Sequence, residues 1–369
     1  MKTAFFFFAL LLAGIVATGQ PAPPRADCGT PPPTPDKRLP PGALDQTRQK
    51  AALPICVRVV VTVFADNNGT NRAATDANVR RQFANMANQF AQHTICFILQ
   101  DIRQVNNTDL NDQVDSTEQA EVFPFRVANV LNIFVHNTLP GLNGTAYGVV
   151  NYNAYLSLSG ATIADPDNVS TMGHEVGHVF GLSHTHDDAN GLENVARSGN
   201  CVNCERHGDA ICDTPADPNQ HTIPGGTDYL SDNTSVGCVY TGTYSDACGV
   251  IYTPSVVNMM AYGRRPCRNQ FTNDQGFTMR FWLGGAPFAY VIEADETVTT
   301  PLFGTVNRSS GSYIDSARDQ INVAQIGTFT VTGTTNQLFQ AKRIIWKPGA
   351  RFTPASLGRT RATANPYCQ

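Results

Sequence analysis

Charged residues are scarce in this chain of 369 residues. Lys, Arg, Asp and Glu make up 15% of it, and the formal net charge is −4 at pH 7. So low a charge density argues against a coiled coil and against a disordered acidic chain. Because there is no basic excess, we expect no nucleic-acid partner. The 30 glycines and 23 prolines instead indicate a globular protein rich in loops and strands, long enough for about two domains.

Long hydrophobic runs are also missing. The most apolar stretch covers residues 4–16, which is well short of the roughly 20 residues that span a bilayer, so we expect no membrane span. Lys2 precedes this run, and a small-residue triplet at 17–19 follows it. That order predicts a signal peptide over residues 1–19 and a secreted, extracellular protein. A buried N-terminal helix is the alternative.

Composition divides the rest of the chain into three parts. Residues 20–54 are rich in proline, which predicts an extended leader or a removable propeptide. Hydrophobic periodicity in residues 55–283 alternates between strand and helix, which predicts an α/β (α+β) domain. The expected strands are 57–64, 96–102, 131–136 and 147–158, and the expected helices are 76–93, for which Asp76 could serve as the cap, and 168–182.

Little periodicity follows the second helix. The chain to about residue 253 is rich in Asn, Asp, Gly and Cys, and so long a loop is usually functional, metal-bound or cross-linked. In residues 284–369 the composition shifts to Thr, Val, Ile and Gly, which predicts a small all-β region. Its expected strands are 321–332, 338–346 and 351–354, with a turn at 347–349.

The segment from His174 to His184, with the sequence HEVGHVFGLSH, carries the chemistry. His174 and His178 are separated by one helical turn, so both imidazoles lie on one face and can reach one ion. Gly181 can leave the helix through a positive φ, which turns His184 back toward the same ion. Zinc suits three neutral imidazoles.

Three protein ligands leave a fourth position of a zinc ion open, as in a catalytic site. A water molecule in that position has its pKa lowered toward about 7. Glu175 follows the first ligand directly and is placed to act as general base and then as general acid. Chance histidines on a polar helix face are the alternative, but Gly181 and His184 at their fixed offsets argue against chance.

These residues resemble those of the metzincin metallopeptidases. The segment Asn258 to Tyr262, NMMAY, is similar to the Met-containing turn of that class. The resemblance implies a twisted mixed sheet with an active-site helix, a structural floor at Met260 and a hydroxyl at Tyr262 that stabilises the tetrahedral intermediate. Ordinary core packing is the alternative for Met260.

Within the metzincins the sequence resembles the cytophagalysin and pappalysin family. The segment 208–218, GDAICDTPADP, and the later residues 267–275 carry this resemblance. It implies calcium near Asp209, Asp213 and Asp217, whose carboxylates are the hard oxygen ligands that calcium prefers. A solvated acidic loop is the alternative.

The chain has ten cysteines. In an exported protein they are first interpreted as disulfides. The family resemblance implies one bridge between Cys238 and Cys267 and another between Cys248 and either Cys201 or Cys204. A structural zinc site is the alternative for the group Cys201, Cys204, His207 and Cys212, and a further pair could form between Cys56 and Cys96.

Cys28 lies in a CGTP segment of the leader that resembles a cysteine switch. In that arrangement a thiolate, which is a good zinc ligand, occupies the fourth metal position until the leader is removed. The number of cysteines leaves two interpretations open. If Cys28 is a thiol, one other cysteine stays unpaired; if all ten pair, Cys28 belongs to a structural bridge.

The sequence therefore predicts a secreted zinc-dependent endopeptidase with protein or peptide substrates. Arg264 and Arg265 follow Tyr262. They predict either a basic wall of the S1′ pocket, which disfavours Lys and Arg in the substrate, or two solvent-facing side chains.

The rival functions are an adhesive protein with a catalytically silent metzincin core and a zinc hydrolase for a small amide or glycan. The β-rich C-terminal region resembles short modules on exported bacterial proteins. This resemblance implies a role in attachment or substrate docking. The alternative is a β-sheet that only covers the catalytic domain. Oligomeric state is left open.

Overall fold

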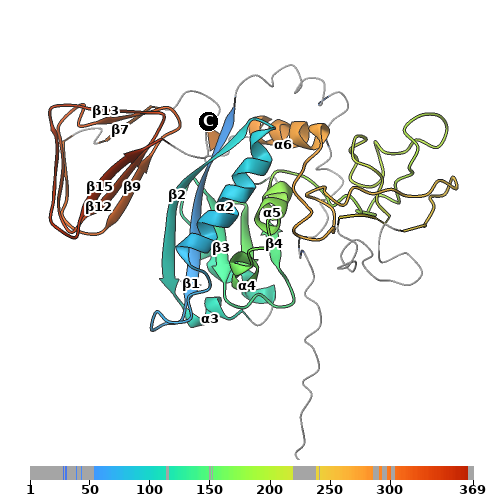
Figure 1. Ribbon diagram of the computed structural model, residues 1–369, viewed down its shortest axis with the longest axis horizontal. Coiled ribbons are helices and arrows are strands. Elements are labelled where there is room, and N and C mark those ends of the chain that lie inside the picture. Colours follow the sequence, from blue (N-terminus) through green and yellow to red (C-terminus); the bar gives the residue numbers. More distant parts are fainter. Residues whose placement is uncertain are drawn as a thin grey trace, which may run out of the picture.

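The computed structural model describes residues 54–113, 116–148, 151, 153–218, 238–240, 242–285, 291–292, 297–300 and 304–364, together with residues 28, 30, 39 and 43. The expected signal peptide, most of the leader and Cys368 lie outside these residues. The described chain forms a mixed α/β part and a C-terminal all-β part, as expected (Figure 1). None of its helices is both long and apolar enough to cross a membrane.

A twisted mixed sheet is the centre of the α/β part (Figure 1). Its strand order is β2-β1-β3-β5-β4, and β6 pairs with β1. Strands β4 and β6 run antiparallel to their neighbours, and the other pairs are parallel. The strands are β1 (Ile55–Ala65), β2 (Ile95–Asn106), β3 (Leu131–His136), β4 (Gly144–Tyr147), β5 (Tyr155–Ser159) and β6 (Val291–Ile292).

The single strand expected at 147–158 is wrong, because the chain reverses there. Gly148 has a φ of 69°, and β4 and β5 lie on either side of this turn as an antiparallel pair. The sequence pattern did not reveal this turn, because apolar residues alternate with the same two-residue period in β4 and in β5. The reversal places β4 at the end of the strand order.

Helix α2 (Asp76–Ala91) covers one face of the sheet together with α5 (Thr171–Val179) (Figure 1). The N-cap of α2 is Thr75, whose hydroxyl accepts a hydrogen bond from the Asn78 amide. Asp76, the expected cap, is instead the first helical residue. The apolar stripe Val79, Phe83, Met86 and Phe90 is fully buried, as its spacing predicts. Each such large side chain stabilises the fold by about 1.5–3 kcal/mol.

The shorter helices are α3 (Thr108–Asn111), α4 (Gly160–Ala164) and a 3-10 helix, Ser116–Phe125. Helix α6 (Asn273–Gly285) was not expected from the sequence. Between α5 and α6 the described residues contain no helix and no strand, apart from isolated bridges, as the composition predicts. Disulfides cross-link this loop, and another joins Cys56 of β1 to its register partner Cys96 of β2.

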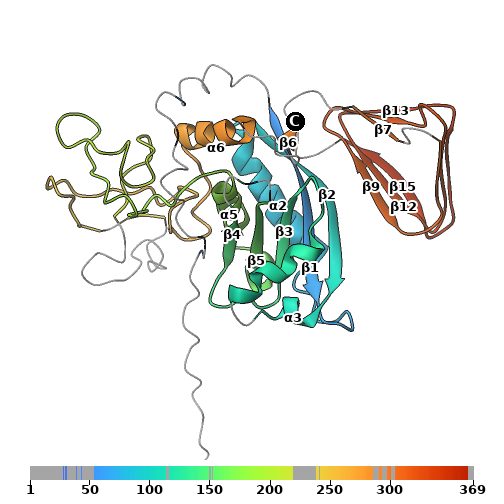
Figure 2. The same ribbon diagram turned by 180° about the vertical axis from the view of Figure 1, so that it is seen from behind.

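The C-terminal part is a three-sided parallel β-solenoid (Figures 1 and 2). Its three sheets have the orders β7-β10-β13, β8-β11-β14 and β9-β12-β15, all parallel. Successive strands therefore lie on different sides, and three strands make one rung. The strands are β7 (Thr297–Thr300), β8 (Thr305–Arg308), β9 (Ser312–Ser316), β10 (Gln320–Val323), β11 (Thr328–Gly333), β12 (Asn336–Gln340), β13 (Arg343–Trp346), β14 (Ala350–Pro354) and β15 (Arg359–Thr363).

The strands expected at 321–332 and 338–346 are each two strands. The first breaks at a corner where Ala324 and Gly327 have φ of 59° and 100°. Register pairs residues 23 positions apart, such as Val298 with Ile321 and Ile321 with Ile344. The rungs share little sequence apart from their inward-facing apolar residues. For this reason composition alone did not reveal the repeat.

Candidate active site

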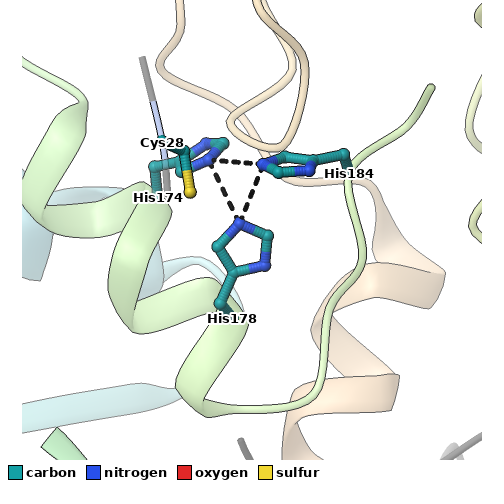
Figure 3. A group of neighbouring side chains, drawn as sticks. All are labelled: Cys28, His174, His178 and His184. Carbon is teal, nitrogen blue, oxygen red and sulfur yellow. Dashed lines mark hydrogen bonds between the residues drawn. The ribbon is translucent and has the colours of Figure 1, made fainter. Parts of the chain in front are cut away.

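Three histidine side chains meet at one point (Figure 3). The Nε2 atom of His174 lies 3.2 Å from that of His178 and 3.2 Å from that of His184, and the third distance is 3.0 Å. His174 and His178 extend from successive turns of α5. Gly181, with a φ of 94°, turns the chain after the helix so that His184 faces them. The positive φ is the conformation that the sequence predicts for this glycine.

Two backbone carbonyls fix the orientation of two of these rings, those of His174 and His178. Nδ1 of His174 lies 2.6 Å from the Met259 carbonyl oxygen, and Nδ1 of His178 lies 2.8 Å from that of Leu182. A carbonyl only accepts, so each Nδ1 carries the proton and each Nε2 keeps a lone pair. Burial lowers the pKa of His178 to about 4 and lowers the pKa values of His174 and His184 well below the usual value. All three rings are therefore neutral.

Neutral imidazoles in this arrangement fit a metal ion. Lone pairs that face one another at 3.0–3.2 Å repel unless a cation lies between them. A tetrahedral ion with bonds of about 2.0–2.1 Å separates its ligand atoms by about 3.3 Å. The Sγ atom of Cys28 joins the group, because one ligand atom from each of the four residues lies within 4.8 Å of the others. This is a three-nitrogen donor set with a sulfur at its open side.

Glu175 is buried beside the histidines. Its Oε2 accepts a hydrogen bond of 2.8 Å from the Thr30 hydroxyl and lies 3.4 Å from the Cys28 thiol. Burial, and then the Glu175 carboxylate, raise the pKa of that thiol. Gly144 of β4 lies against Glu175, since a Cβ there would be 2.8 Å from the Glu175 Cγ. The Thr30 hydroxyl also accepts from the Ala146 amide of β4, at 2.7 Å.

The methionine turn lies beneath α5. Met259 and Met260 are fully buried, and a Cβ at Gly177 would lie 2.7 Å from the Met260 sulfur. The next aromatic residue, Tyr262, packs edge-on against His184, with 4.8 Å between ring centroids. Its hydroxyl donates to the Cys28 carbonyl at 3.3 Å. The structure thus brings the expected catalytic and structural residues into one group.

Sequence reasoning missed His186. Its buried ring stacks on His184 with centroids 4.8 Å apart and planes 11° apart. It also contacts the Tyr262 ring, at 4.3 Å. The signal was present as a histidine two positions after His184, but a sequence cannot show that both rings meet the same tyrosine.

The buried acidic residues of the loop differ from the expected set of Asp209, Asp213 and Asp217. Asp209 and Asp217 are buried, and they are joined by Glu193, which the sequence analysis missed. Burial raises the pKa of Asp209 to about 8, and burial together with Asp209 raises that of Glu193 to about 9. Asp213 is exposed and accepts from the Thr272 hydroxyl and the Asp274 amide at the start of α6.

The described cysteines of the loop between α5 and α6 form disulfides. The pairs are Cys238 with Cys267, Cys201 with Cys248, and Cys204 with Cys212. The first pair is the one that the family resemblance implies, and Cys201 is the partner of Cys248. A structural zinc at Cys201, Cys204 and Cys212 is therefore wrong, because no thiolate remains there. Arg264 and Arg265 are half-buried.

Fold and site together define a metzincin-like metallopeptidase: a twisted mixed sheet, a helix with two histidines, a third histidine beyond a glycine, and a methionine turn below. Residues 136–283 match the family model Peptidase_M43, described as pregnancy-associated plasma protein-A. This match confirms the resemblance to the pappalysin family that was inferred from the sequence.

The chain is also similar to named relatives and to solved structures. The chain is 24% identical over 284 residues to proteins named extracellular metalloprotease from Arthroderma benhamiae and from Trichophyton verrucosum, covering 73% of this chain and 94% of each relative. Among solved structures, mature mirolysin of Tannerella forsythia in complex with a cleaved peptide is 21% identical, with a TM-score of 0.42. That match covers 62% of this chain and 90% of mirolysin.

Proposed function

We propose that this protein is a secreted zinc-dependent endopeptidase. The observation that carries the proposal is the convergence of three neutral imidazoles, with Nε2 atoms 3.0–3.2 Å apart. His174, His178 and His184 would hold the zinc ion. The match of residues 136–283 to a metallopeptidase family model supports the reaction class, and the names of the relatives support an extracellular location.

Bound zinc supplies a Lewis acid and lowers the pKa of a bound water to about 7. The Glu175 carboxylate takes the proton of the attacking water and delivers it to the leaving amine. Burial and the contact with Gly144 hold this carboxylate in place. The Tyr262 hydroxyl, once it is released from the Cys28 carbonyl, is free to donate to the oxygen of the scissile carbonyl as negative charge develops.

An extended substrate has a place to pair. Strand β4 is the last strand in the sheet order, so its outer edge presents backbone groups to a peptide. In the structure the Ala146 amide on this edge is bound by the Thr30 hydroxyl. Removal of the leader would release the amide for a substrate carbonyl.

We also propose that the leader keeps the enzyme latent. Cys28 forms no disulfide with any described cysteine, is buried, and places its sulfur beside the three imidazoles (Figure 3). This favours the cysteine switch over a structural bridge. Thr30 adds a second block, because its hydroxyl engages the general base and the β4 edge together.

Calcium is a further proposed ligand, at Asp209, Asp217 and Glu193. These buried carboxylates have Arg197 as a neighbouring cation, which contacts Glu193 at 2.8 Å. Buried negative charge is costly unless a cation or protons neutralise it, and the raised pKa values of Asp209 and Glu193 reflect that cost. Carboxylate oxygens suit calcium. The exposed Asp213 has a helix-capping role instead.

The central test compares the full chain with its Glu175→Ala variant, both in the Cys28→Ala background so that the thiol does not block the site. We expect about one zinc per chain in both proteins and casein hydrolysis only in the protein that keeps Glu175. Zinc in both with equal activity would refute the mechanism. Zinc in both with no activity on casein or on a peptide library would favour the silent adhesive core or a small-amide hydrolase.

A further inference from the structure

The last rung of the solenoid, β13, β14 and β15 with their turns, has an unusual charge. Residues 342–364 contain six cations and no acidic residue. Because the whole chain has a net charge of −4, the remainder carries −10. All six cations are exposed: Lys342, Arg343, Lys347, Arg351, Arg359 and Arg361.

Neighbouring strands do not neutralise this charge. The register places Arg343 beside Gln320, Arg351 beside Thr330 and Arg361 beside Leu338, all uncharged. In the described part of the chain, Lys342 alone of the six forms an ion pair, with Asp319 at 3.2 Å. An exposed pair of this kind contributes little to stability. Arg343 donates hydrogen bonds to the neutral side chain of Gln320, which leave its charge in place, so the rung keeps its positive charge.

Among the described residues, the same rung forms one end of the solenoid core. In the described chain, β13, β14 and β15 are each the end strand of their sheet. Their inward-facing side chains are only partly covered: Trp346 is 42% exposed, whereas its partner Val323 in the middle rung is fully buried. On the turn after β14, Leu357 is 78% exposed. Apolar surface rimmed by charge is typical of an interaction site.

The positions of the cations indicate which shape of partner can contact all of them. Arg343, Arg351 and Arg359 lie on three different sides of the solenoid, because β13, β14 and β15 belong to three different sheets. A linear polyanion along one side would meet two or three of the cations, whereas a flat anionic surface against the end of the solenoid can meet all six. A second copy of the same end would bring six positive charges against six.

We propose that the last rung docks the protein onto an anionic lipid surface, with Trp346 and Leu357 at headgroup level. Tryptophan and basic residues are the side chains favoured at the membrane–water interface. The acidic remainder of the chain is repelled by such a surface, so the end of the solenoid is the part that approaches it. This docking is independent of the peptidase reaction.

The test uses the full chain with Glu175→Ala, which prevents self-cleavage, and co-sedimentation with vesicles. We expect binding to phosphatidylcholine vesicles with about 30% phosphatidylglycerol, no binding to pure phosphatidylcholine, and weakening with salt. The pairs Arg343→Gln/Arg351→Gln and Arg359→Gln/Arg361→Gln remove charge from different sides, and each should lower the partition coefficient on the order of 25-fold. The matched control, Arg80→Gln/Arg206→Gln, removes two exposed cations of the α/β part and should leave binding unchanged.

A second readout reports on the apolar end. In a Trp282→Phe background, Trp346 is the remaining tryptophan, and its emission should shift to shorter wavelength when phosphatidylglycerol vesicles are added. Equal binding to both vesicle types, an equal loss in the control variant, or no shift of the Trp346 emission on bound protein would overturn the proposal. Loss of binding in one pair only, together with tight binding to heparin, would overturn it in favour of a linear polyanion.

Discussion

The hydroxyl of Thr30 donates a 2.8 Å hydrogen bond to Oε2 of Glu175, although 145 residues separate the two in the chain. Through the same oxygen, Thr30 accepts the Ala146 amide. One leader side chain therefore engages the proposed general base and the edge strand at once. Hydrogen bonds to a carboxylate contribute about 1.5–3 kcal/mol, so this contact helps to hold Thr30 beside Glu175.

Latency should consequently depend on two residues. We expect Cys28→Ala and Thr30→Val each to raise peptide hydrolysis by the zinc-loaded full chain, roughly 10-fold for Thr30→Val by the loss of one charged hydrogen bond. The double variant should exceed both. Thr30→Ser, which keeps the hydroxyl, is the control and should stay latent. A mercurial that gives no gain of activity, alongside a mapped disulfide at Cys28, would exclude the switch.

Gly144→Ala should damage catalysis without removing the metal. The added Cβ would lie 2.8 Å from Cγ and Oε1 of Glu175, so the carboxylate must shift away from the attacking water. We expect kcat to fall by at least about 10²-fold, since misplacement of about 1 Å has that effect. Zinc content, measured by atomic absorption, should not change. A fall in zinc that parallels the fall in kcat would show that the contact is only structural.

His186 should act as a positioning residue. Its ring contacts His184 and Tyr262 on two sides, so His186→Ala leaves space in which Tyr262 can turn. We expect kcat to fall about 10-fold with KM nearly constant, because the proposed role of the tyrosine is in the transition state. His186→Phe keeps the flat ring and should retain most of the activity. Equal losses in the Ala and Phe variants would contradict a packing role.

Stability should respond to pH and to calcium together. The folded-state pKa values of Asp209, about 8, and Glu193, about 9, lie above their ordinary values. The folded protein therefore holds protons that the unfolded chain releases above about pH 4, and the free energy of unfolding falls as pH rises from about 4 to 9. In the proposed site calcium would replace those protons, so its stabilising effect should increase over the same range.

The measurement is the melting temperature between pH 5 and 9 with zinc held constant, in calcium and in EGTA. Glu193→Gln should flatten the EGTA profile, whereas Asp188→Asn, at an exposed position, should leave it unchanged. A calcium effect that is the same at every pH, or that survives in Glu193→Gln, would place the ion elsewhere.

Substrate preference is a separate prediction. Arg264 and Arg265 follow Tyr262 and are half-buried, so we expect a cleavage library to show few Lys or Arg residues at P1′. Arg264→Glu/Arg265→Glu should raise cleavage before basic residues. Dominant Lys or Arg at P1′ in the unsubstituted enzyme would discard the basic wall.

Local patterns predicted the parts of the fold that depend on neighbours in sequence. Strand β3 has the expected bounds, Leu131–His136, and the buried stripe of α2 follows its helical period. The hydrophobic pattern did not predict the chain reversal at Gly148, because apolar and polar residues keep alternating across it. Nor did it predict the corner between two strands at Ala324 and Gly327. In these places backbone conformation changes while the hydrophobic pattern continues.

The sequence by itself determined the convergence of His174, His178 and His184, because helical spacing and a positive φ at Gly181 are local properties. It also carried the resemblance to the pappalysin family, whose model matches residues 136–283. Only the tertiary structure decided that Thr30 meets Glu175, that Glu193 joins Asp209, and that His186 supports Tyr262. Such contacts depend on how the sheet, the loop and the leader pack, and packing between distant segments leaves no periodic trace in a single sequence.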